Sequence, residues 1–249
     1  MSYEEILLNH KSVRDFEKKP VDCELVKKLI RCGQHAPTSE FIQSYSVINV
    51  SDPKLREAIY DDVTSQKVVL DAPVFLIFLA DVSRLLLAGE LNHSEVPEHY
   101  LQSTETFLMA SVDTAIMAQT VAIAAEMEGL GCTFIGGIRN NPEKVIQMLH
   151  VPKGAFPLFG LVMGYPKGKK QEEVKPRLPL EEIYNENSYD TSGRVGLLDD
   201  YDTAVRKYYI RRTNGKRNET WIQQMAAFIT EDQRPNLKKA IAKQGFELK

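Results

Sequence analysis

Two basic residues held among prolines form the first pattern here that could do chemistry. Lys175 and Arg177 alternate with Pro176 and precede Pro179. Proline restricts the backbone, and in an extended segment residues two positions apart point the same way. A fixed pair of cations would suit a phosphate group, although a solvated basic loop would have the same composition.

Two further polar segments could bind anions. The loop from His10 to Arg14 is dense in hydrogen-bond donors and has Ser12 at its centre. Basic residues also gather toward the C-terminal end of a predicted helix. Such residues complement the helix dipole, but this cluster is denser than that purpose requires. Its members are Arg211, Arg212, Lys216 and Arg217.

A pair of glycines, Gly136 and Gly137, follows a short strand predicted over Cys132 to Ile135. Two glycines at a strand end indicate either a turn that needs positive φ or a place where another group comes close to bare backbone. The sequence leaves both interpretations open.

One long apolar segment must position these residues. From Phe107 to Met127, apolar and small residues fall on nearly every side of a helical period, which predicts a helix buried all round. Asp113 and Gln119 interrupt it, and both are expensive in lipid, so a membrane span is not expected. A chain of this size does not easily bury so apolar a helix, and the equivalent helix of a second copy could pack against it. We therefore expect a homodimer.

The remaining periodicity predicts a mixture of helices and strands. A capping box at Ser2 and Glu5 opens the first helix, and Pro53 and Pro142 each stand at the first turn of another. Further helices are expected after Asp22 and over 199–212, and a last helical region is expected from Thr220, interrupted near Pro235. Strands are expected at 46–50, 74–80 and 158–164, and the middle one is an unbroken apolar run covered on both faces.

Composition narrows the classes of function. The chain has 249 residues, which suits one domain or one domain with an appendage. Its net charge of −3 gives no sign of a nucleic-acid or membrane partner. The three cysteines have neither metal-ligand nor redox spacing, and we expect them to be buried small hydrophobes. No leader pattern is present, so a cytoplasmic protein is expected. The stretch with His93, Glu95, Glu98 and His99 is interpreted as a solvated loop, and no metal is expected.

Each pattern is ordinary alone, but their order resembles the flavin-dependent nitroreductase family. The similarity is strongest to its oxygen-insensitive NADPH nitroreductases and NADPH:FMN reductases of the flavin reductase P type. It covers essentially the whole chain. The most specific motifs are IGGIRNN at 135–141, KPRLP at 175–179 and ENSY at 186–189.

The resemblance implies an α+β nitroreductase-like fold. Its central, mostly antiparallel sheet would be flanked by helices, with the long buried helix at an intertwined homodimer interface. A single FMN-binding domain would span 1–249, with excursions near 81–103 and 190–235. FMN would be held noncovalently and would carry the chemistry, so no catalytic side chain is expected.

The resemblance also assigns roles to individual residues. His10, Ser12, Lys175 and Arg177 would take the flavin phosphate, and Arg14 would place a positive charge near the pyrimidine end of the ring. Gln66 would hydrogen-bond that edge, and Thr38, Ser39 and Phe41 would form the partner subunit's loop over the ring. Ile135, Gly136 and Gly137 would bring backbone close to the flavin N5.

Coenzyme choice is implied in the same way. Arg212, Lys216 and Arg217 would meet the 2′-phosphate of NADPH, the co-substrate, and Arg139 would make a further phosphate contact. Ping-pong hydride transfer from NADPH to FMN would then reduce small-molecule acceptors such as nitroaromatics, quinones or free flavin. Lys216 offers a compact ammonium group rather than the planar guanidinium of arginine, which can make two parallel hydrogen bonds to a phosphate. The strictness of the NADPH preference is therefore left open.

Other functions stay open at this point. A reductase devoted to supplying reduced FMN, or to reducing a disulfide, would have the same fold. A flavin-binding or redox-sensing protein without turnover is a different class, and the basic cluster argues against it because a passive carrier has no use for a 2′-phosphate site. A plain dimeric helical scaffold is the last alternative, and it would take up no FMN.

Overall fold

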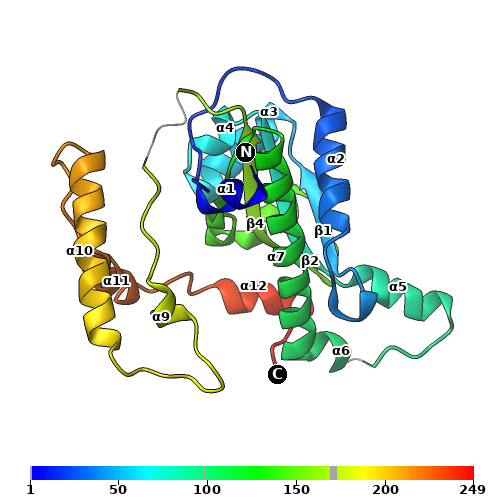
Figure 1. Ribbon diagram of the computed structural model, residues 1–249. Helices are drawn as coiled ribbons and strands as arrows, with labels where there is room; N and C mark the ends of the chain where they lie inside the picture. Colours follow the sequence, from blue (N-terminus) through cyan, green and yellow to red (C-terminus); the bar gives the residue numbers. More distant parts are fainter. Residues whose placement is uncertain (1, 98, 169–172) are drawn as a thin grey trace. The chain divides into compact units, whose positions relative to one another are not determined.

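A computed structural model describes residues 2–97, 99–168 and 173–249. The chain divides into two compact units (Figure 1). The first comprises Met1–Gly168 and Arg234–Lys249, and the second comprises Lys169–Gln233. Each unit is described by itself. The prediction of one FMN-binding domain over 1–249 stays a prediction.

The first unit is built on a four-stranded sheet with the order β1-β2-β4-β3. Every pair of neighbouring strands is antiparallel, which confirms the predicted sheet. The strands expected from sequence are all present, with ends that differ by a few residues. They are β1 (Tyr45–Asn49), β2 (Val74–Asp81), β3 (Gly131–Ile135) and β4 (Ala155–Gly164).

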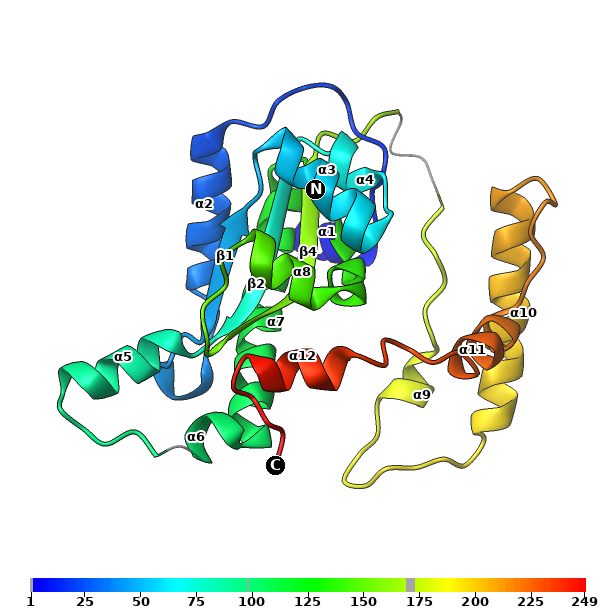
Figure 2. The same cartoon turned by 180° about the vertical axis from the view of Figure 1, so that it is seen from behind.

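Helices cover both faces of this sheet, which explains why β2 is apolar from Val74 to Ala80. Leu76 and Phe78 of β2 belong to the core formed with α2 (Cys23–Gln34) and α7 (Thr104–Met127). Phe75 and Ile77 point the other way, into a core shared with the helices seen in front of the sheet in Figure 2. Those helices are α3 (Pro53–Ile59), α4 (Val68–Asp71) and α8 (Pro142–Met148).

The long helix α7 is buried along one side only. Met117 and Val121 face the sheet and α2, whereas Leu108, Val112 and Ile116 are 55%, 45% and 39% exposed. One chain therefore covers only one face of α7, and burial of the other face by a second copy stays a prediction. By length and composition α7 could cross a membrane, but cores also contain such helices.

Caps explain where several helices begin. Ser2 and Glu5 form the predicted capping box of α1 (Tyr3–Leu8). Asp22, Asp52 and Asn141 accept hydrogen bonds from the first turns of α2, α3 and α8. These side chains satisfy backbone N–H groups that lack partners within the helix.

Some helices were not predicted, or begin elsewhere than expected. A π-helical turn, η2 (Tyr60–Thr64), follows α3, and α5 (Ser83–Leu91) lies where no helix was expected. The segment expected as a loop contains α6 (His99–Gln102). The C-terminal α12 (Leu237–Lys243) packs Ile241 into a core with Phe156 of β4.

The second unit has its own small aromatic core. It contains α9 (Leu180–Ile183), α10 (Arg194–Arg212) and α11 (Trp221–Ile229). α10 begins five residues before the predicted position of 199. Its buried side chains pack against Leu178 and Trp221, and they are Tyr201, Val205, Tyr208 and Tyr209.

The cysteines differ in their burial. Cys132 is buried as expected, but Cys23 is exposed at the first turn of α2, so the prediction of three buried cysteines is wrong. Within the described residues, no group of three or more His, Cys, Asp or Glu could hold a metal ion. Glu98, one of the four residues weighed as metal ligands, lies outside the described residues.

Candidate functional site

The segment from His10 to Arg14 runs beside strand β3. The backbone N–H of Val13 donates to the carbonyl of Cys132 at 2.9 Å, and the Thr133 hydroxyl donates to the carbonyl of Val13 at 2.7 Å. These bonds fix Val13 against the sheet. Ser12 and Arg14, on either side of it, are exposed. The predicted donors are therefore presented on an ordered, extended segment.

His10 makes a long-range contact that the sequence did not predict. Its Nδ1 lies 2.6 Å from Oε1 of Glu126, which is in the last turn of α7. The same carboxylate oxygen accepts from the Cys132 thiol at 3.7 Å. Burial, aided by the Glu126 charge, raises the pKa of Cys132 to about 12, so this thiol stays protonated and serves as a donor.

The loop that contains Thr38, Ser39 and Phe41 is tied to α7 by Asp113. One carboxylate oxygen of Asp113 accepts from the Ser39 backbone N–H at 2.9 Å and from the Ser39 hydroxyl at 3.1 Å. The other accepts from the Ser44 hydroxyl at 2.8 Å. Sequence reasoning treated Asp113 as an interruption. A buried acid in an apolar helix requires such partners.

Phe41 projects from this loop into solvent. Its side chain is 82% exposed, and its φ of 63° lies in the left-handed region, as does that of Glu40 at 43°. Non-glycine residues adopt this conformation uncommonly, at a cost of order 1 kcal/mol. The loop thus holds an aromatic side chain outward in a strained turn.

The glycine pair opens a 3₁₀ turn, η3 (Gly136–Asn140), directly after β3. Neither glycine has positive φ, so the interpretation as a turn that needs positive φ is wrong. A Cβ on Gly137 would lie 3.5 Å from Oε1 of Gln66 and 3.4 Å from Cβ of Thr64. The fold therefore brings Gln66 against the glycine turn, as the predicted roles of both require.

Two guanidinium groups border the same turn. A Cβ on Gly136 would lie 3.6 Å from Arg139 and 3.9 Å from Arg234. Arg234 donates to the Gly136 carbonyl at 3.4 Å and to the Asn140 side chain at 3.1 Å. Arg139 donates to the carbonyl of Leu158. Burial, and then the charge of Arg234, lowers the pKa of Arg139.

Arg139 and Arg234 make this turn a place that favours an anion. Among the described residues, neither arginine forms a recorded ion pair with a carboxylate. The sequence missed Arg234, which lies far along the chain and outside every motif. The pairing of two distant arginines at one turn could be found only from the fold.

In the second unit, the proline-rich segment has the predicted alternation. Lys175 and Arg177 are exposed, and Pro176 between them is half-buried. The Tyr201 hydroxyl donates to the carbonyl of Pro176 at 3.3 Å, which ties the segment to α10. The Lys175 ammonium lies 5.6 Å from the centroid of the Tyr209 ring.

The basic end of α10 divides into paired and unpaired cations. Arg211 is paired with Glu173. Arg217 lies 2.9 Å from Glu219 and stacks 3.9 Å from the Tyr209 ring centroid. Arg212 donates to the Tyr208 hydroxyl at 3.1 Å. No ion pair with a carboxylate is recorded for Arg212 or Lys216 within the described part of the chain, so these two are the cations best placed for a phosphate.

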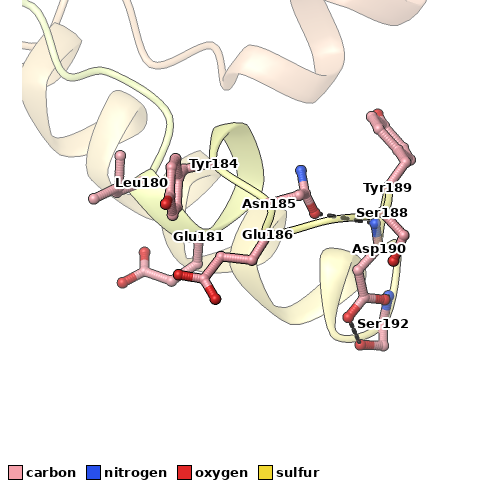
Figure 3. Close-up of a pocket in the computed structure, with 9 residues that line it drawn as sticks. All are labelled: Leu180, Glu181, Tyr184, Asn185, Glu186, Ser188, Tyr189, Asp190 and Ser192. Atoms are coloured by element: carbon pink, nitrogen blue, oxygen red, sulfur yellow. Dashed lines mark hydrogen bonds between the residues drawn. The ribbon is translucent and has the colours of Figure 1, made fainter.

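A separate hollow of about 610 Å³ lies within the second unit and contains none of the predicted site residues. Figure 3 shows that it is framed by a single stretch of chain and that Asp190 is held by Asn185 and Ser192. Three carboxylates make it unsuited to an anion. Its lining is Leu180, Glu181, Tyr184, Asn185, Glu186, Ser188, Tyr189, Asp190 and Ser192.

The residues present fit a flavin with a phosphate tail. In the first unit, donors from the His10 segment, the amide of Gln66 and the bare backbone of the glycine turn match a ring edge, a ring face and an anion. Thr38, Ser39 and Phe41 are held by α7, and Ile135 is buried beneath the turn. The further predicted cations belong to the second unit, and they are Lys175, Arg177, Arg212, Lys216 and Arg217.

Comparisons with known proteins identify the family. The family description "Nitroreductase family" matches residues 7–165, and "Nitroreductase family, C-terminal domain" matches residues 175–249. A protein of Staphylococcus saprophyticus named NADPH-dependent oxidoreductase is 35% identical over 243 residues, covering 97% of this chain and 96% of that protein.

Solved structures of nitroreductases and related oxidoreductases are similar to this chain over nearly its whole length. The NfrA1 nitroreductase from B. subtilis is 36% identical with a TM-score of 0.93, covering 99% of both chains. The NADPH:FMN oxidoreductase from Vibrio harveyi, complexed with NAD+, is 30% identical with a TM-score of 0.86, and 99% of each chain is covered. The predicted fold and enzyme class are confirmed. The chain therefore belongs to the nitroreductase family of oxidoreductases.

Proposed function

We propose that this protein is an NADPH-dependent oxidoreductase that holds FMN noncovalently and reduces small acceptors such as nitroaromatics, quinones or free flavin. The observation that carries the proposal is the η3 turn, where Gln66 meets Gly137 and two guanidinium groups border Gly136. An amide, bare backbone and positive charge at one turn suit the polar edge of a flavin ring. The names of the relatives, NADPH-dependent oxidoreductase and NADPH:FMN oxidoreductase, support the same activity.

The protein's own residues would orient the reactants. Bound FMN would supply the redox chemistry, taking a hydride from NADPH and passing two electrons to the acceptor in a ping-pong cycle. Gln66 would fix the pyrimidine edge of the ring, and Arg14 would favour negative charge there. The glycine turn would let backbone approach without a side chain across the ring face. Phe41 would limit which acceptors enter.

A homodimer is part of this proposal. Leu108, Val112 and Ile116 form an apolar stripe, four residues apart, on the exposed face of α7. A second copy would cover the stripe and would bring its own Thr38–Phe41 loop to the ring. Sedimentation velocity of an Ile116→Glu variant should give a monomer, with Lys28→Glu on the surface of α2 as the matched control. A variant that stays dimeric would rule out this face.

The phosphate assignment predicts loss of the cofactor. Replacing Lys175 and Arg177 together by alanine removes two exposed cations from one proline-fixed segment, so the protein should lose most of its FMN on gel filtration. Lys27→Ala with Lys28→Ala removes the same charge from α2 and should leave flavin content unchanged. Full retention of FMN in the first variant would contradict the assignment.

A narrower function is supported by one relative. The Vibrio harveyi protein is named for its FMN substrate, and this chain could likewise supply reduced FMN to other enzymes. Steady-state turnover with added FMN, compared with a nitroaromatic and a quinone, separates the two. A far higher kcat/KM for FMN would favour the narrower function.

A further inference from the structure

The carboxylate of Glu126 lies between two residues that are distant from it in sequence. It is 2.6 Å from Nδ1 of His10 and 3.7 Å from the thiol of Cys132. The Glu126 side chain is 13% exposed and the His10 side chain 35%, so the carboxylate is largely shielded while the imidazole reaches the surface. No predicted role uses Glu126.

Its position on the helix is unfavourable for an acid. Glu126 is in the last turn of α7, where the helix dipole disfavours negative charge by about 0.3–1 kcal/mol. No basic residue stands in that turn to compensate. The pairing with His10 is the contact that offsets this cost. Cys132 cannot, because its thiol stays protonated and is only a weak donor.

The contact with Glu126 also determines which nitrogen of the imidazole is left to meet a phosphate. A carboxylate has no proton to give, so Nδ1 of His10 must donate to Glu126. The second ring nitrogen, Nε2, then points away from Glu126. Phosphate oxygens also accept, so a ring that meets Glu126 through Nδ1 and a phosphate through Nε2 would donate from both nitrogens.

We propose that Glu126 is a positioning residue that orients the imidazole of His10 toward the FMN phosphate. This inference rests on the proposed function and on the expectation that His10 and Ser12 meet the flavin phosphate together with Lys175 and Arg177. Glu126 would itself repel a phosphate, so its benefit to binding must pass through the imidazole. Charge-assisted hydrogen bonds are roughly twice as strong as neutral ones, which gives the pairing a measurable effect on affinity.

The test compares two flavins that differ only in the phosphate. The full-length protein, stripped of flavin, is titrated with FMN and with riboflavin. Glu126→Gln keeps the shape of the side chain and removes its charge. We expect FMN affinity to fall about tenfold, as for the loss of one charged hydrogen bond, and riboflavin affinity to stay within twofold of wild type, about the level of experimental scatter.

Glu128→Gln is the matched control. Glu128 is two residues further on, has the same charge, and pairs with Lys28 at 2.6 Å instead of His10. This variant should bind both flavins like the wild type. Glu126→Asp retains the charge but shortens the reach, and it should reproduce the loss for FMN. It provides a second measurement if the glutamine variant folds poorly.

A double-variant comparison separates this inference from the proposed function. In a His10→Gln background, Glu126→Gln should have no further effect on FMN. Equal losses for FMN and riboflavin, or an unchanged loss in the His10→Gln background, would overturn the positioning role. If His10→Gln leaves the ratio of FMN to riboflavin affinity unchanged, the phosphate assignment of His10 fails as well. A wild-type protein that binds neither flavin would end the proposed function itself.

Discussion

Asp113 shows what a single residue contributes to the site. Its two carboxylate oxygens accept three hydrogen bonds from Ser39 and Ser44, so one acid in the helix holds the loop that carries Phe41. The sequence showed that an acid stands in an apolar helix, but not which donors reach it. Partners 69 and 74 residues away are set by the fold.

Removing Asp113 should therefore weaken both the fold and the loop. Asp113→Ala leaves buried donors unsatisfied, so we expect the free energy of unfolding to fall by about 2–4 kcal/mol. Urea denaturation measures this loss. Limited proteolysis should show earlier cleavage within 38–44.

The control for Asp113 is Asp62→Ala. Asp62 forms an exposed ion pair with Lys144 at 3.4 Å, and such pairs contribute about 1 kcal/mol or less. Similar losses in the two variants, with no change in the loop's sensitivity to protease, would show that Asp113 does not anchor the loop.

At the scale of elements, the periodic segments could be predicted and the irregular ones could not. Each predicted strand is present because alternation and apolar runs are local properties. The π-helical turn η2 continues the helix predicted through Val63, and α6 was missed because it has only four residues. The leucines of α5 stand side by side at 85–87 rather than on one helical face, so no helical period marked it. At the basic end of α10, composition showed four cations but not the pairing of Arg211 with Glu173 and of Arg217 with Glu219.

This pairing predicts unequal roles in coenzyme choice. Within residues 2–97, 99–168 and 173–249, Arg212 has no carboxylate partner, whereas Arg217 is shared with Glu219, Gln224 and Tyr209. Arg212→Ala should raise the KM for NADPH roughly ten- to hundredfold, the value of one lost charged contact, with little change for NADH. Arg217→Ala should have a smaller effect. Steady-state kinetics with both coenzymes measures these KM values. An equal rise of the KM for NADPH and for NADH in Arg212→Ala would contradict a 2′-phosphate role for Arg212.

At the scale of the whole molecule, the order of motifs was more informative than any one motif. The glycine pair alone left two interpretations open, and one of them, a turn with positive φ, was wrong. Its place between a buried strand and a proline-capped helix, together with the KPRLP segment, pointed correctly to the family. The long helix needed a second surface, which one chain could not supply.

The most direct test of the proposed function is an anaerobic stopped-flow experiment on the FMN-loaded protein. NADPH and NADH are mixed with it in parallel, and the visible absorption band of the flavin is followed. Rapid bleaching by NADPH, faster than by NADH, is the expected result, and it would establish the reductive half of the cycle. If FMN binds and neither coenzyme bleaches it, the protein is not an NADPH-dependent oxidoreductase, and a flavin-storage or sensing function would take its place.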